Sequence, residues 1–503
     1  MPNHLFHAIR TALPGLDAVF IETQDGRVWT YGDMLGQSAR IAHVLRERGV
    51  QPGDRVAVQV EKSAEALMLY LACVRCGAVY LPLNTGYTVA ELDYFFNDAK
   101  PAVIVVSPHN ADRLAETVKG CGAVLETLDD HGGGSLMESA RAAATDFDDV
   151  ERGPDDLAAI LYTSGTTGRS KGAMLSHDNL LSNALTLRES WRFTAQDRLI
   201  HALPIFHTHG LFVATNVILV SGASMFLLPK FDADAIVARL PKSSVLMGVP
   251  TFYVRLAQDD RVNRDSTANM RLFISGSAPL LAETHDTFRA RTGHAILERY
   301  GMTETNMNTS NPYDGDRIAG TVGFPLPGVD IRVVDMENGA ALPAGETGML
   351  EVRGPNVFRG YWNMPEKTKA EFRDDGFFIT GDLGLIDERG YVHIVGRGKD
   401  LVISGGYNIY PKEIESEIDL IDGVLESAVI GVPHADFGEG VTAVVVPKNG
   451  AALKEDEILA ALGERLARYK LPKRVLFAEE LPRNTMGKVQ KNLLREAWKD
   501  LYA

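Results

Sequence analysis

The stretch YTSGTTGRSKG, from Tyr162 to Gly172, is the part of the sequence on which the interpretation of the fold depends. It combines small hydroxyl side chains with three glycines, and a lysine, Lys171, stands next to its end. Glycine lets a backbone approach an anion closely, hydroxyl groups donate hydrogen bonds, and lysine adds a positive charge. The stretch therefore predicts a loop that holds phosphate groups. For the loop taken alone, a flexible turn without a function is the alternative.

The loop differs from a Walker loop. The Walker pattern G-x-x-x-x-G-K-[ST] places a glycine before the lysine and, after it, a hydroxyl that reaches magnesium. Here Ser170 precedes Lys171, and Gly172 follows it. The stretch is therefore a different phosphate loop. Its candidate phosphate-binding residues are Thr163, Ser164, Gly165, Thr166, Thr167, Gly168 and Lys171.

Strand and helix patterns alternate on both sides of the loop. In the first part of the chain the strand patterns are VWT, DRVAVQVE, AVYLPLN and PAVIVVSP, with helical patterns between them. One of these helices covers residues 64–76, and Gly77 is predicted to end it. The alternation resumes after the loop and continues to Ala290. Alternating strands and helices predict parallel α/β sheets.

The pattern changes in the second half of the chain. From Gly320 short strands are separated by turns, which predicts mostly antiparallel β structure. After Asp400 a compact segment carries helical patterns at residues 411–420 and 455–468 and two apolar strand patterns, ESAVIGV and VTAVVV. A second, small α+β domain is therefore expected. The predicted domains are residues 1–398 and 399–503.

Composition and charge restrict the class of function. The 503 residues are 45% apolar and 23% charged, which is typical of a globular protein with more than one domain. The net charge of −15 argues against binding of nucleic acid or of an anionic membrane, because both need a basic surface. The N-terminus MPNHLFHAIRTALPG lacks the features of a secretory signal. We expect a cytoplasmic protein that acts on small molecules.

Four local patterns each have two interpretations. Residues 199–229 contain no charged side chain and are long enough to span a membrane, but proline and polar residues favour a buried helix and strand. Cys73 and Cys76 form a C-x-x-C pair, yet no second ligand pair exists, which favours core packing over zinc or redox chemistry. Most charged side chains in residues 465–499 are basic, which is typical of a solvated helix face or of a functional site. The glycine- and acid-rich residues between 128 and 156 predict an exposed connection.

The chain resembles the adenylate-forming acyl-CoA synthetases through seven motifs in the right order. These motifs are YTSGTTGRSKG, PIFHTHG, ERYGMTET, FITGD, GRGKD, SGGYNIYPKEIE and PRNTMGK. The loop departs from the family pattern only at Arg169 and Ser170, where many members carry a residue followed by proline. The resemblance implies a large N-terminal domain of parallel α/β sheets with a β-rich subdomain, followed by a small mobile C-terminal α+β domain.

The resemblance also implies a site for ATP and Mg²⁺. Tyr300 would stack near the adenine, Asp382 and Arg397 would hold the ribose hydroxyls, and Glu304 would hold magnesium. Each residue type suits its role, because an aromatic face packs on a purine and a carboxylate oxygen suits a hard cation. Taken singly, Asp382 could be a turn residue and Glu304 a helix-start carboxylate. Further nucleotide-site residues implied by the resemblance are Glu298 and Thr303.

The reaction implied by the resemblance has two halves. A carboxylate first attacks the α-phosphate of ATP to give an acyl-adenylate and pyrophosphate, and the thiol of coenzyme A then displaces AMP. Lys488 matches the family's adenylation lysine, and its acetylation by a protein lysine acetyltransferase, reversed by a deacetylase, would switch the enzyme off. Lys399 matches the hinge of the small domain, and His207 the gate of the coenzyme A passage. That passage would be lined by Ser404, Gly405 and Gly406.

Two arginines indicate which acid is used. Arg299 precedes the adenine-site tyrosine, and Arg255 lies on the helix that resembles the acyl-pocket wall. A buried guanidinium needs a carboxylate partner, so the substrate is expected to bring a second carboxylate. An internal salt bridge with Glu298 or Asp259 is the alternative. The pair resembles the members of the family that activate malonate, and the pocket, sized for malonate or methylmalonate, would be closed by Thr208, Ser277 and Met307.

Two further functions stay open at this point. One is another acyl- or aryl-CoA ligase of the same family. The other belongs to a different class, a nucleotide-binding protein without turnover. The presence of Lys488, Lys399 and the glycines of SGGYN together counts against a protein without turnover, which has no need for all of them.

Overall fold

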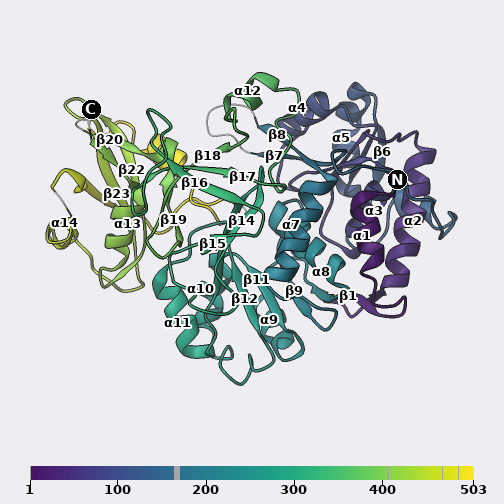
Figure 1. Cartoon of the computed structure of the whole chain (residues 1–503), viewed down its shortest axis with the longest axis horizontal. Helices are drawn as coiled ribbons and strands as arrows, with labels where there is room; N and C mark the ends of the chain where they lie inside the picture. The colour runs from purple at the N-terminus through teal and green to yellow at the C-terminus, as the bar shows by residue number, and fades with distance from the viewer. Residues whose placement is uncertain (1, 164–169, 405–406, 467, 485–486, 503) are drawn as a thin grey trace. The chain divides into compact units, whose positions relative to one another are not determined.

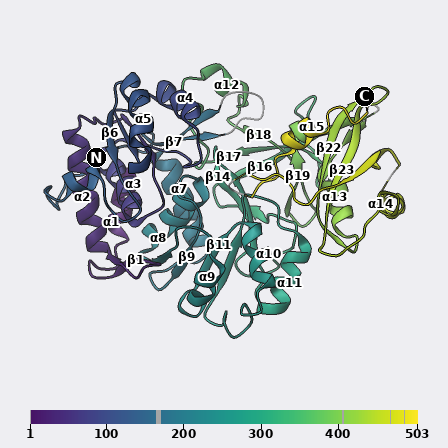
Figure 2. The same cartoon turned by 180° about the vertical axis from the view of Figure 1, so that it is seen from behind.

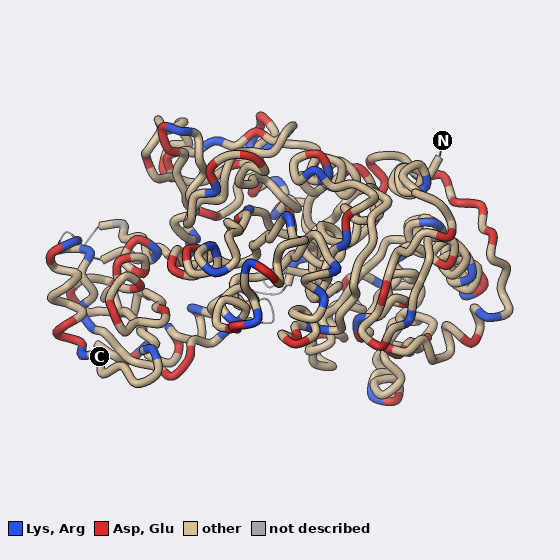
Figure 3. Tube along the Cα trace, turned by 90° about the horizontal axis from the view of Figure 1, so that it is seen from below, with Lys and Arg blue, Asp and Glu red and all other residues tan. Residues whose placement is uncertain are grey.

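The computed structural model describes residues 2–163, 170–404, 407–466, 468–484 and 487–502 (Figure 1). The chain divides into two compact units, and Figure 2 shows the same elements from behind. Acidic and basic residues are distributed along the whole trace (Figure 3). The first unit comprises residues 1–320, 324–330 and 353–376, and the second comprises residues 321–323, 331–352 and 377–503.

A six-stranded sheet in the first unit carries the phosphate loop. Its strand order is β6-β5-β3-β4-β7-β8, parallel except for the antiparallel pair β7 and β8. The strands are β3 (Arg55–Gln59), β4 (Val79–Pro82), β5 (Val103–Val106), β6 (Val124–Thr127), β7 (Leu157–Thr163) and β8 (Lys171–Ser176). Buried strand residues such as Ile104 and Ile160 pack against Phe95 and Phe96 of helix α4 (Val89–Ala99). The predicted parallel α/β sheet is confirmed.

A nine-stranded sheet forms the rest of the first unit. Its order is β15-β14-β13-β12-β11-β9-β10-β1-β2, and the strands from β13 to β1 in this order are parallel. The strands are β1 (Val19–Thr23), β2 (Val28–Thr30), β9 (Arg198–His201), β10 (Ser224–Leu227), β11 (Val245–Gly248), β12 (Leu272–Ser275), β13 (Leu297–Met302), β14 (Asn306–Ser310) and β15 (Phe324–Pro325). Helix α7 (His177–Ser190) contacts β7, β8 and β14, so it joins the two sheets.

The other helices of the first unit follow the predicted alternation. Helix α3 (Ala64–Cys76) has the predicted bounds, because the Ser63 hydroxyl accepts a hydrogen bond from the Ala66 N–H and Gly77 ends the helix with φ of 77°. Cys73 and Cys76 are buried in it as free thiols, as predicted. The remaining helices are α1 (His4–Thr11), α2 (Tyr31–Glu47), α5 (Pro108–Cys121), α6 (Ser135–Ala140), α8 (Asn216–Ser221), α9 (Ala233–Arg239), α10 (Pro250–Gln258), α11 (Ala282–Thr292) and α12 (Pro365–Ala370).

The uncharged residues 199–229 form internal elements of the nine-stranded sheet and its cover. They contain β9, a π-helical turn at His209–Thr215, α8 and β10, and most of their side chains are buried. Within the described residues no helix has the length and apolar character that a membrane crossing requires. The interpretation as a buried helix and strand is confirmed.

The second unit contains two sheets. They are mainly antiparallel, but β24 pairs with β23 in parallel. One has the order β16-β17-β18-β19, and the other has β22 and β23 at its centre. These strands are β16 (Asp330–Val334), β17 (Gly348–Arg353), β18 (Phe378–Ile386), β19 (Val392–Arg397), β20 (Val402–Ser404), β21 (Tyr407–Ile409), β22 (Val424–His434), β23 (Gly438–Pro447) and β24 (Arg474–Phe477), and the helices are α13 (Pro411–Asp419), α14 (Glu455–Gly463) and α15 (Lys491–Ala497). The predicted β-rich and α+β segments are confirmed.

Two predictions made from local pattern need correction. The helix expected over residues 455–468 ends at Gly463, because glycine disfavours a helix interior. The connection expected to be exposed is only partly so, because it contains α6 and several buried apolar side chains and is anchored to the domain. Asp149 accepts hydrogen bonds from Arg10 and from the buried Arg75, and Phe147 is buried.

Candidate active site

The two ends of the phosphate loop are held together by the β7–β8 hairpin. Thr163 ends β7 and lies opposite Lys171, which begins β8. Residues 164–169 lie outside the described residues, so the positions predicted for Ser164, Gly165, Thr166, Thr167 and Gly168 remain predictions. At the C-terminal end of the loop, the Tyr94 hydroxyl donates a hydrogen bond to the Ser170 carbonyl at 2.8 Å. Helix α4 therefore fixes one end of the loop.

Lys171 lies in a cluster of charged and aromatic side chains. Its Nζ is 3.2 Å from Glu371 Oε1 and 4.0 Å from the centre of the Tyr361 ring. Lys367 also contacts Glu371, at 2.7 Å. Burial would raise the pKa of Glu371, but the hydrogen bonds from Lys367 and Tyr361 and the charge of Lys171 outweigh burial and lower it. Glu371 is therefore an anion that binds Lys171 while no phosphate is near.

Glu304 stands at the tight turn between β13 and β14, and its chemistry fits magnesium. It is buried, and its Oε1 lies 3.1 Å from the Tyr361 hydroxyl. Among the described residues there is no group of three or more His, Cys, Asp or Glu that could form a metal cage. A magnesium ion that is bound chiefly by nucleotide phosphates and water needs only one protein carboxylate. The donor set therefore suits an ion that arrives with its nucleotide.

The nucleotide-site residues of ERYGMTET lie on β13 and the following turn. Tyr300 is partly exposed on β13, and Thr303 is partly exposed in the turn. Glu298 is buried, and its carboxylate accepts a hydrogen bond from the Gly320 N–H at 3.2 Å. Its backbone carbonyl accepts two more from Asn311. Glu298 therefore fixes the loop after β14, a role that the sequence did not predict.

Arg299 is a buried guanidinium, and two of its nitrogens lack a hydrogen-bond partner in the described part of the chain. Its side chain is 3% exposed, and its Nε and Nη2 find no hydrogen-bond partner among the described residues. The predicted alternative, an ion pair with Glu298, is absent there. Gly276 leaves room for the guanidinium, because a Cβ at that position would lie 2.4 Å from Arg299 Cζ. Burial lowers the pKa of Arg299 to about 9, which is the energetic signature of a charge that lacks its counterion.

His209 and Ser277 lie next to this guanidinium. His209 Nδ1 is 3.2 Å from Ser277 Oγ, while His209 Nε2 is buried without a partner in the described part of the chain. Burial, followed by the charges of Arg299, His201 and His207, keeps the pKa of His209 well below its ordinary value, so the ring is neutral. Ser277 has φ of 73°, an uncommon conformation for a residue other than glycine. Such strain is typical of functional sites.

The remaining predicted pocket residues occupy the π-helical segment and β14. Thr208 is buried, and its hydroxyl donates a hydrogen bond to Asn306 Oδ1 at 2.9 Å. Met307 is buried on β14. His207 is partly exposed. Thr208, His207 and His209 belong to one motif, which places them beside the residues of β13 and β14.

Arg255 differs from the expectation of a buried guanidinium. It is exposed on α10, and its Cζ lies 5.4 Å from the centre of the Phe231 ring. The buried face of α10 is formed by Phe252, Tyr253, Leu256 and Ala257. At 3.6 residues per turn, position 255 falls outside that face. Within the described residues Arg255 forms no ion pair, so neither salt bridge proposed as the alternative is present.

Asp382 and Arg397 form a cross-strand pair in the second unit. They lie opposite each other on β18 and β19, and Arg397 Nε is 2.6 Å from Asp382 Oδ1. Asp382 is buried, and its N–H donates to the Thr380 hydroxyl. One carboxylate oxygen therefore binds the guanidinium. The antiparallel register explains why two residues separated in sequence act as a pair.

Lys488 and Lys399 lie near the same pair. Lys488 is an exposed residue, but desolvation and the charge of Arg397, with a further contribution from Lys399, lower its pKa to about 8. Desolvation is the largest cause, and the carboxylates of Asp382 and Asp400 partly offset the positive charges of Arg397 and Lys399. Lys399 lies in a short 3₁₀ turn, and burial lowers its pKa. Ser404 is buried at the end of β20, whereas Gly405 and Gly406 lie outside the described residues.

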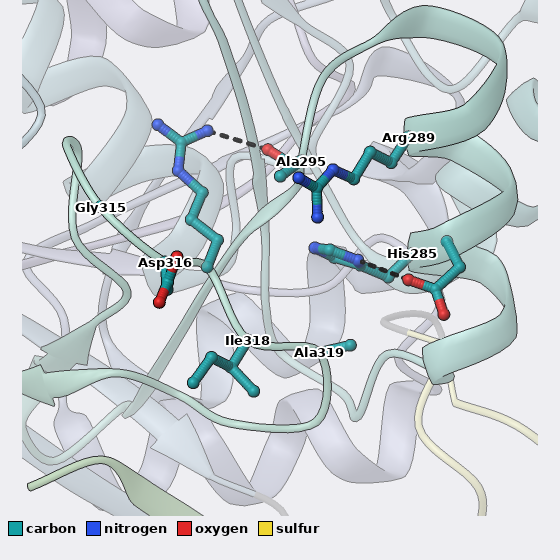
Figure 4. A pocket seen from close by; sticks show the side chains of 9 residues that line it. His285, Arg289, Ala295, Gly315, Asp316, Ile318 and Ala319 are labelled. Carbon is teal, nitrogen blue, oxygen red and sulfur yellow. Dashed lines mark hydrogen bonds and ion pairs between the residues drawn. The ribbon is translucent and has the colours of Figure 1, made fainter. Parts of the chain in front are cut away.

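A separate cavity of about 300 Å³ lies along α11 and contains none of the predicted site residues (Figure 4). His285 and Arg289 project from α11, and Asp286 Oδ1 lies 3.6 Å from His285 Nδ1. Arg317 donates to the Ala295 carbonyl and to two other carbonyls, so its charge has a structural role. Acidic and basic side chains both line this cavity, so it does not present a uniform charge to a ligand.

Three residues of the site were missed by sequence reasoning. His209 stands inside the PIFHTHG motif, so a buried histidine next to the gate residue was a visible signal. Tyr361 and Glu371 carry no such signal. They lie between the ERYGMTET and FITGD motifs, outside both, and join Lys171 and Glu304 only through the tertiary fold.

Known proteins match the chain along its whole length. The family model described as AMP-binding enzyme matches residues 9–362, and that of the AMP-binding enzyme C-terminal domain matches residues 413–488. A crystal structure of ATP-bound MatB from Rhodopseudomonas palustris is 63% identical in sequence, with a TM-score of 0.98 and 100% of both chains covered. A malonate–CoA ligase from Arabidopsis thaliana is 34% identical over 98% of this chain and 90% of its own. A feruloyl-CoA synthase from Amycolatopsis sp is 37% identical over 93% and 94%.

Proposed function

The chain belongs to the AMP-binding enzyme family, and from this premise we propose that it ligates malonate to coenzyme A, with malonyl-adenylate as the intermediate. The products are malonyl-CoA, AMP and pyrophosphate. Methylmalonate is expected to be a second substrate, because it adds only a methyl group to the same diacid. The family that the seven motifs predicted is confirmed by the match of its model to most of the chain.

The buried guanidinium of Arg299 is the observation that carries the choice of a diacid. A buried charge without a partner is costly, and its pKa of about 9 reflects that cost. A substrate carboxylate that accepts bidentate hydrogen bonds from Nε and Nη2 removes the cost. The Ser277 hydroxyl and the neutral His209 offer further polar contacts next to Arg299. A monocarboxylate would leave these groups unpaired.

In the first half-reaction, one carboxylate of malonate attacks the α-phosphorus of ATP. A P–O bond to the carboxylate oxygen forms, the bond to the bridging oxygen breaks, and pyrophosphate leaves. Lys171 is proposed to leave Glu371 and bind the phosphates, and Glu304 to hold magnesium, which when bound neutralises phosphate charge. Lys488 is proposed to stabilise the negative charge that develops on the phosphoryl oxygens. Tyr300, Asp382 and Arg397 would hold the nucleoside.

In the second half-reaction, the thiol of coenzyme A attacks the carbonyl carbon of malonyl-adenylate. A C–S bond forms, the C–O bond to AMP breaks, and the thiol proton is lost to solvent or base. His207 is proposed to gate the entry of the thiol, and Ser404 with Gly405 and Gly406 to line its passage. Lys399 is proposed as the hinge that lets the C-terminal segment serve both half-reactions.

A second candidate substrate class is an aromatic acid, because the feruloyl-CoA synthase relative is as similar in sequence as the malonate–CoA ligase relative. The two candidates make different demands on the pocket. An aromatic acid needs an apolar cavity, whereas this pocket contains a buried guanidinium and a neutral histidine. The polar lining favours the diacid.

A panel of acids tests the proposal. Purified protein is incubated with ATP, Mg²⁺ and coenzyme A and one of malonate, methylmalonate, succinate, acetate, butyrate or ferulate, and AMP formation is measured. We expect malonate to give the highest kcat/KM and AMP formation to require coenzyme A for turnover. A higher value for ferulate or butyrate contradicts the choice of malonate, and no AMP with any acid contradicts a ligase.

Acetylation of Lys488 is proposed as a control of the first half-reaction. A lysine whose pKa is lowered to about 8 has a larger fraction of neutral amine at pH 7 than an ordinary lysine, so it is the more reactive nucleophile. Acetylation removes the charge on which adenylation depends. Mass spectrometry of a chemically acetylated sample, compared with its pyrophosphate-exchange rate, tests this: full activity with Lys488 fully acetylated contradicts it.

A further inference from the structure

Tyr361 connects the phosphate lysine to the proposed magnesium ligand. Its hydroxyl lies 2.6 Å from Glu371 Oε2 and 3.1 Å from Glu304 Oε1, and Lys171 contacts both Glu371 and the face of the Tyr361 ring. The ring is 3% exposed, so water does not substitute for these contacts. Four side chains from distant parts of the first unit thus form one hydrogen-bonded cluster.

A phenol has one proton, and two carboxylates compete for it. An ordinary phenol is protonated at neutral pH, so the hydroxyl donates one hydrogen bond at a time. The shorter contact, to Glu371, identifies the acceptor while Lys171 is also bound to Glu371. Glu304 is then in contact with a hydroxyl oxygen whose proton points elsewhere.

We propose that Tyr361 is a positioning residue that couples phosphate binding by Lys171 to magnesium binding by Glu304. When Lys171 moves from Glu371 to a phosphate, the Tyr361 hydroxyl turns its proton to one oxygen of Glu304 and orients the other oxygen toward the metal. Partners that orient a metal ligand in this way commonly change metal affinity by about ten- to a hundredfold. Glu371 holds Lys171 and the Tyr361 proton until nucleotide arrives.

The inference rests on the proposed roles of Lys171 and Glu304 but not on the identity of the acid. Its test therefore contains no malonate. Binding of ATP to the full-length protein is measured by titration calorimetry over a series of MgCl₂ concentrations, and AMP binding is measured in EDTA. AMP lacks the β- and γ-phosphates, so it reports the nucleoside site without the cluster.

Tyr361→Phe removes the hydroxyl and keeps the ring that packs against Phe358. We expect the Mg²⁺ concentration at half-maximal ATP binding to rise about ten- to a hundredfold, while AMP affinity changes less than about twofold. Tyr31→Phe is the matched control. It removes a buried tyrosine hydroxyl that donates to the Ala223 carbonyl at 2.7 Å, far from the cluster in sequence, and it should leave the Mg²⁺ midpoint unchanged.

Glu371→Gln should act in the opposite direction. The amide no longer competes as an anion for Lys171 or for the Tyr361 proton, so ATP binding should tighten about three- to tenfold although two ion pairs are lost. A residue that only supports the fold would weaken ATP binding when changed.

Three results overturn the inference: an unchanged Mg²⁺ midpoint in Tyr361→Phe, equal losses of ATP and AMP affinity in that variant, or weaker ATP binding in Glu371→Gln. Failure of the malonate assignment looks different, because it leaves the Mg²⁺ midpoints as expected and appears only in the panel of acids. Parent protein that binds ATP equally with and without Mg²⁺ overturns both this inference and the role of Glu304.

Discussion

Arg299 is proposed to set the preference for a diacid, so its removal should separate malonate from monocarboxylates. In Arg299→Ala we expect kcat/KM for malonate to fall about ten- to a few hundredfold, because hydrogen bonds to charged groups contribute about 1.5 to 3 kcal/mol each. The kcat/KM for butyrate should stay the same or rise, since the cost of leaving a buried guanidinium unpaired is gone. The measurement is the ratio of the two kcat/KM values in parent and variant.

Arg255→Ala is the control for this prediction. Equal roles were predicted for the two arginines, but Arg255 is exposed on α10 while Arg299 is buried. An exposed guanidinium is hydrated in the free protein, so we expect its removal to change the malonate-to-butyrate ratio much less. If the two variants reduce that ratio equally, Arg255 reaches the substrate. If the kcat/KM values for malonate and butyrate fall by the same factor in Arg299→Ala, Arg299 supports the fold instead of selecting the substrate.

Lys488 makes the first half-reaction depend on pH. A lysine carries its charge below its pKa, and this pKa is lowered to about 8 from an ordinary value of 10.5. Since the charge is required, kcat/KM for malonate-dependent pyrophosphate exchange should fall as pH rises through about 8, with a limiting slope of tenfold per pH unit. An ordinary lysine would lose its charge only near pH 10.5.

Variants at Lys488 distinguish this lysine from other groups that titrate. Lys488→Ala should lower pyrophosphate exchange about a hundred- to a thousandfold and abolish the decline near pH 8, while thioester formation from supplied malonyl-adenylate stays largely intact. The activity of Lys488→Arg, whatever its level, should not decline near pH 8, because a guanidinium stays charged at higher pH. Lys499, an exposed lysine paired with Glu496, supplies the control, and its change to Ala should leave the profile unaltered. A decline near pH 8 that persists in Lys488→Ala contradicts the assignment.

At the scale of the element, the β13–β14 hairpin positions Arg299, Tyr300 and Glu304 together. Gly301 makes its close approach possible, because a Cβ there would lie 1.9 Å from the Asn306 carbonyl oxygen and 2.6 Å from Met307 Cε. A backbone oxygen cannot move aside as a side chain can. Gly301→Ala should therefore displace β14, lower the melting temperature by several degrees and reduce ATP binding.

Gly120→Ala provides the matched control for the hairpin. Gly120 lies in α5, and a Cβ there would meet no atom within 4 Å. In a helix interior alanine is more favourable than glycine by about 0.5 to 1 kcal/mol, so this variant should melt at the same or a slightly higher temperature. The melting temperatures of both variants, measured by thermal unfolding, test this difference. Gly301→Ala with unchanged stability and ATP affinity would mean that the hairpin tolerates the displacement.

At the scale of the whole molecule, the two half-reactions place different demands on the C-terminal segment. Lys488 is proposed for adenylation and Ser404 with its neighbours for the thiol step, and Lys399 precedes both in the sequence. Lys399→Pro fixes φ near −65° and restricts the residue before it. We expect malonyl-adenylate to form normally and malonyl-CoA production to fall strongly.

Two assays on the same sample test the hinge. Malonate-dependent pyrophosphate exchange reports adenylation, and steady-state malonyl-CoA formation reports the complete reaction. Lys399→Ala is the control, because it removes the side chain and leaves the backbone free. If Lys399→Pro shows parental rates in both assays, the hinge lies elsewhere. If Lys399→Pro loses both rates equally while Lys399→Ala keeps them, the proline has damaged the fold.

The sequence by itself determined the fold class and the family, and it supplied the candidates for the site. Helix α3 has its predicted bounds because its apolar pattern, its Ser63 cap and Gly77 all act within one or two turns of the chain. The motifs in their order were sufficient for the family, since residue types at fixed short spacings carry that chemistry. Local information also had a limit, because the helix expected to Arg468 ends at Gly463.

Only the tertiary structure decided which charges are buried and which distant residues meet. Arg255 and Arg299 look alike in sequence, but the packing of α10 leaves one in water and the packing of β13 buries the other. Tyr361 and Glu371 reach Lys171 across a large separation in the chain. Helix and strand patterns reflect interactions within a few residues, whereas burial and long-range pairing depend on how whole sheets pack, which no short stretch of sequence specifies.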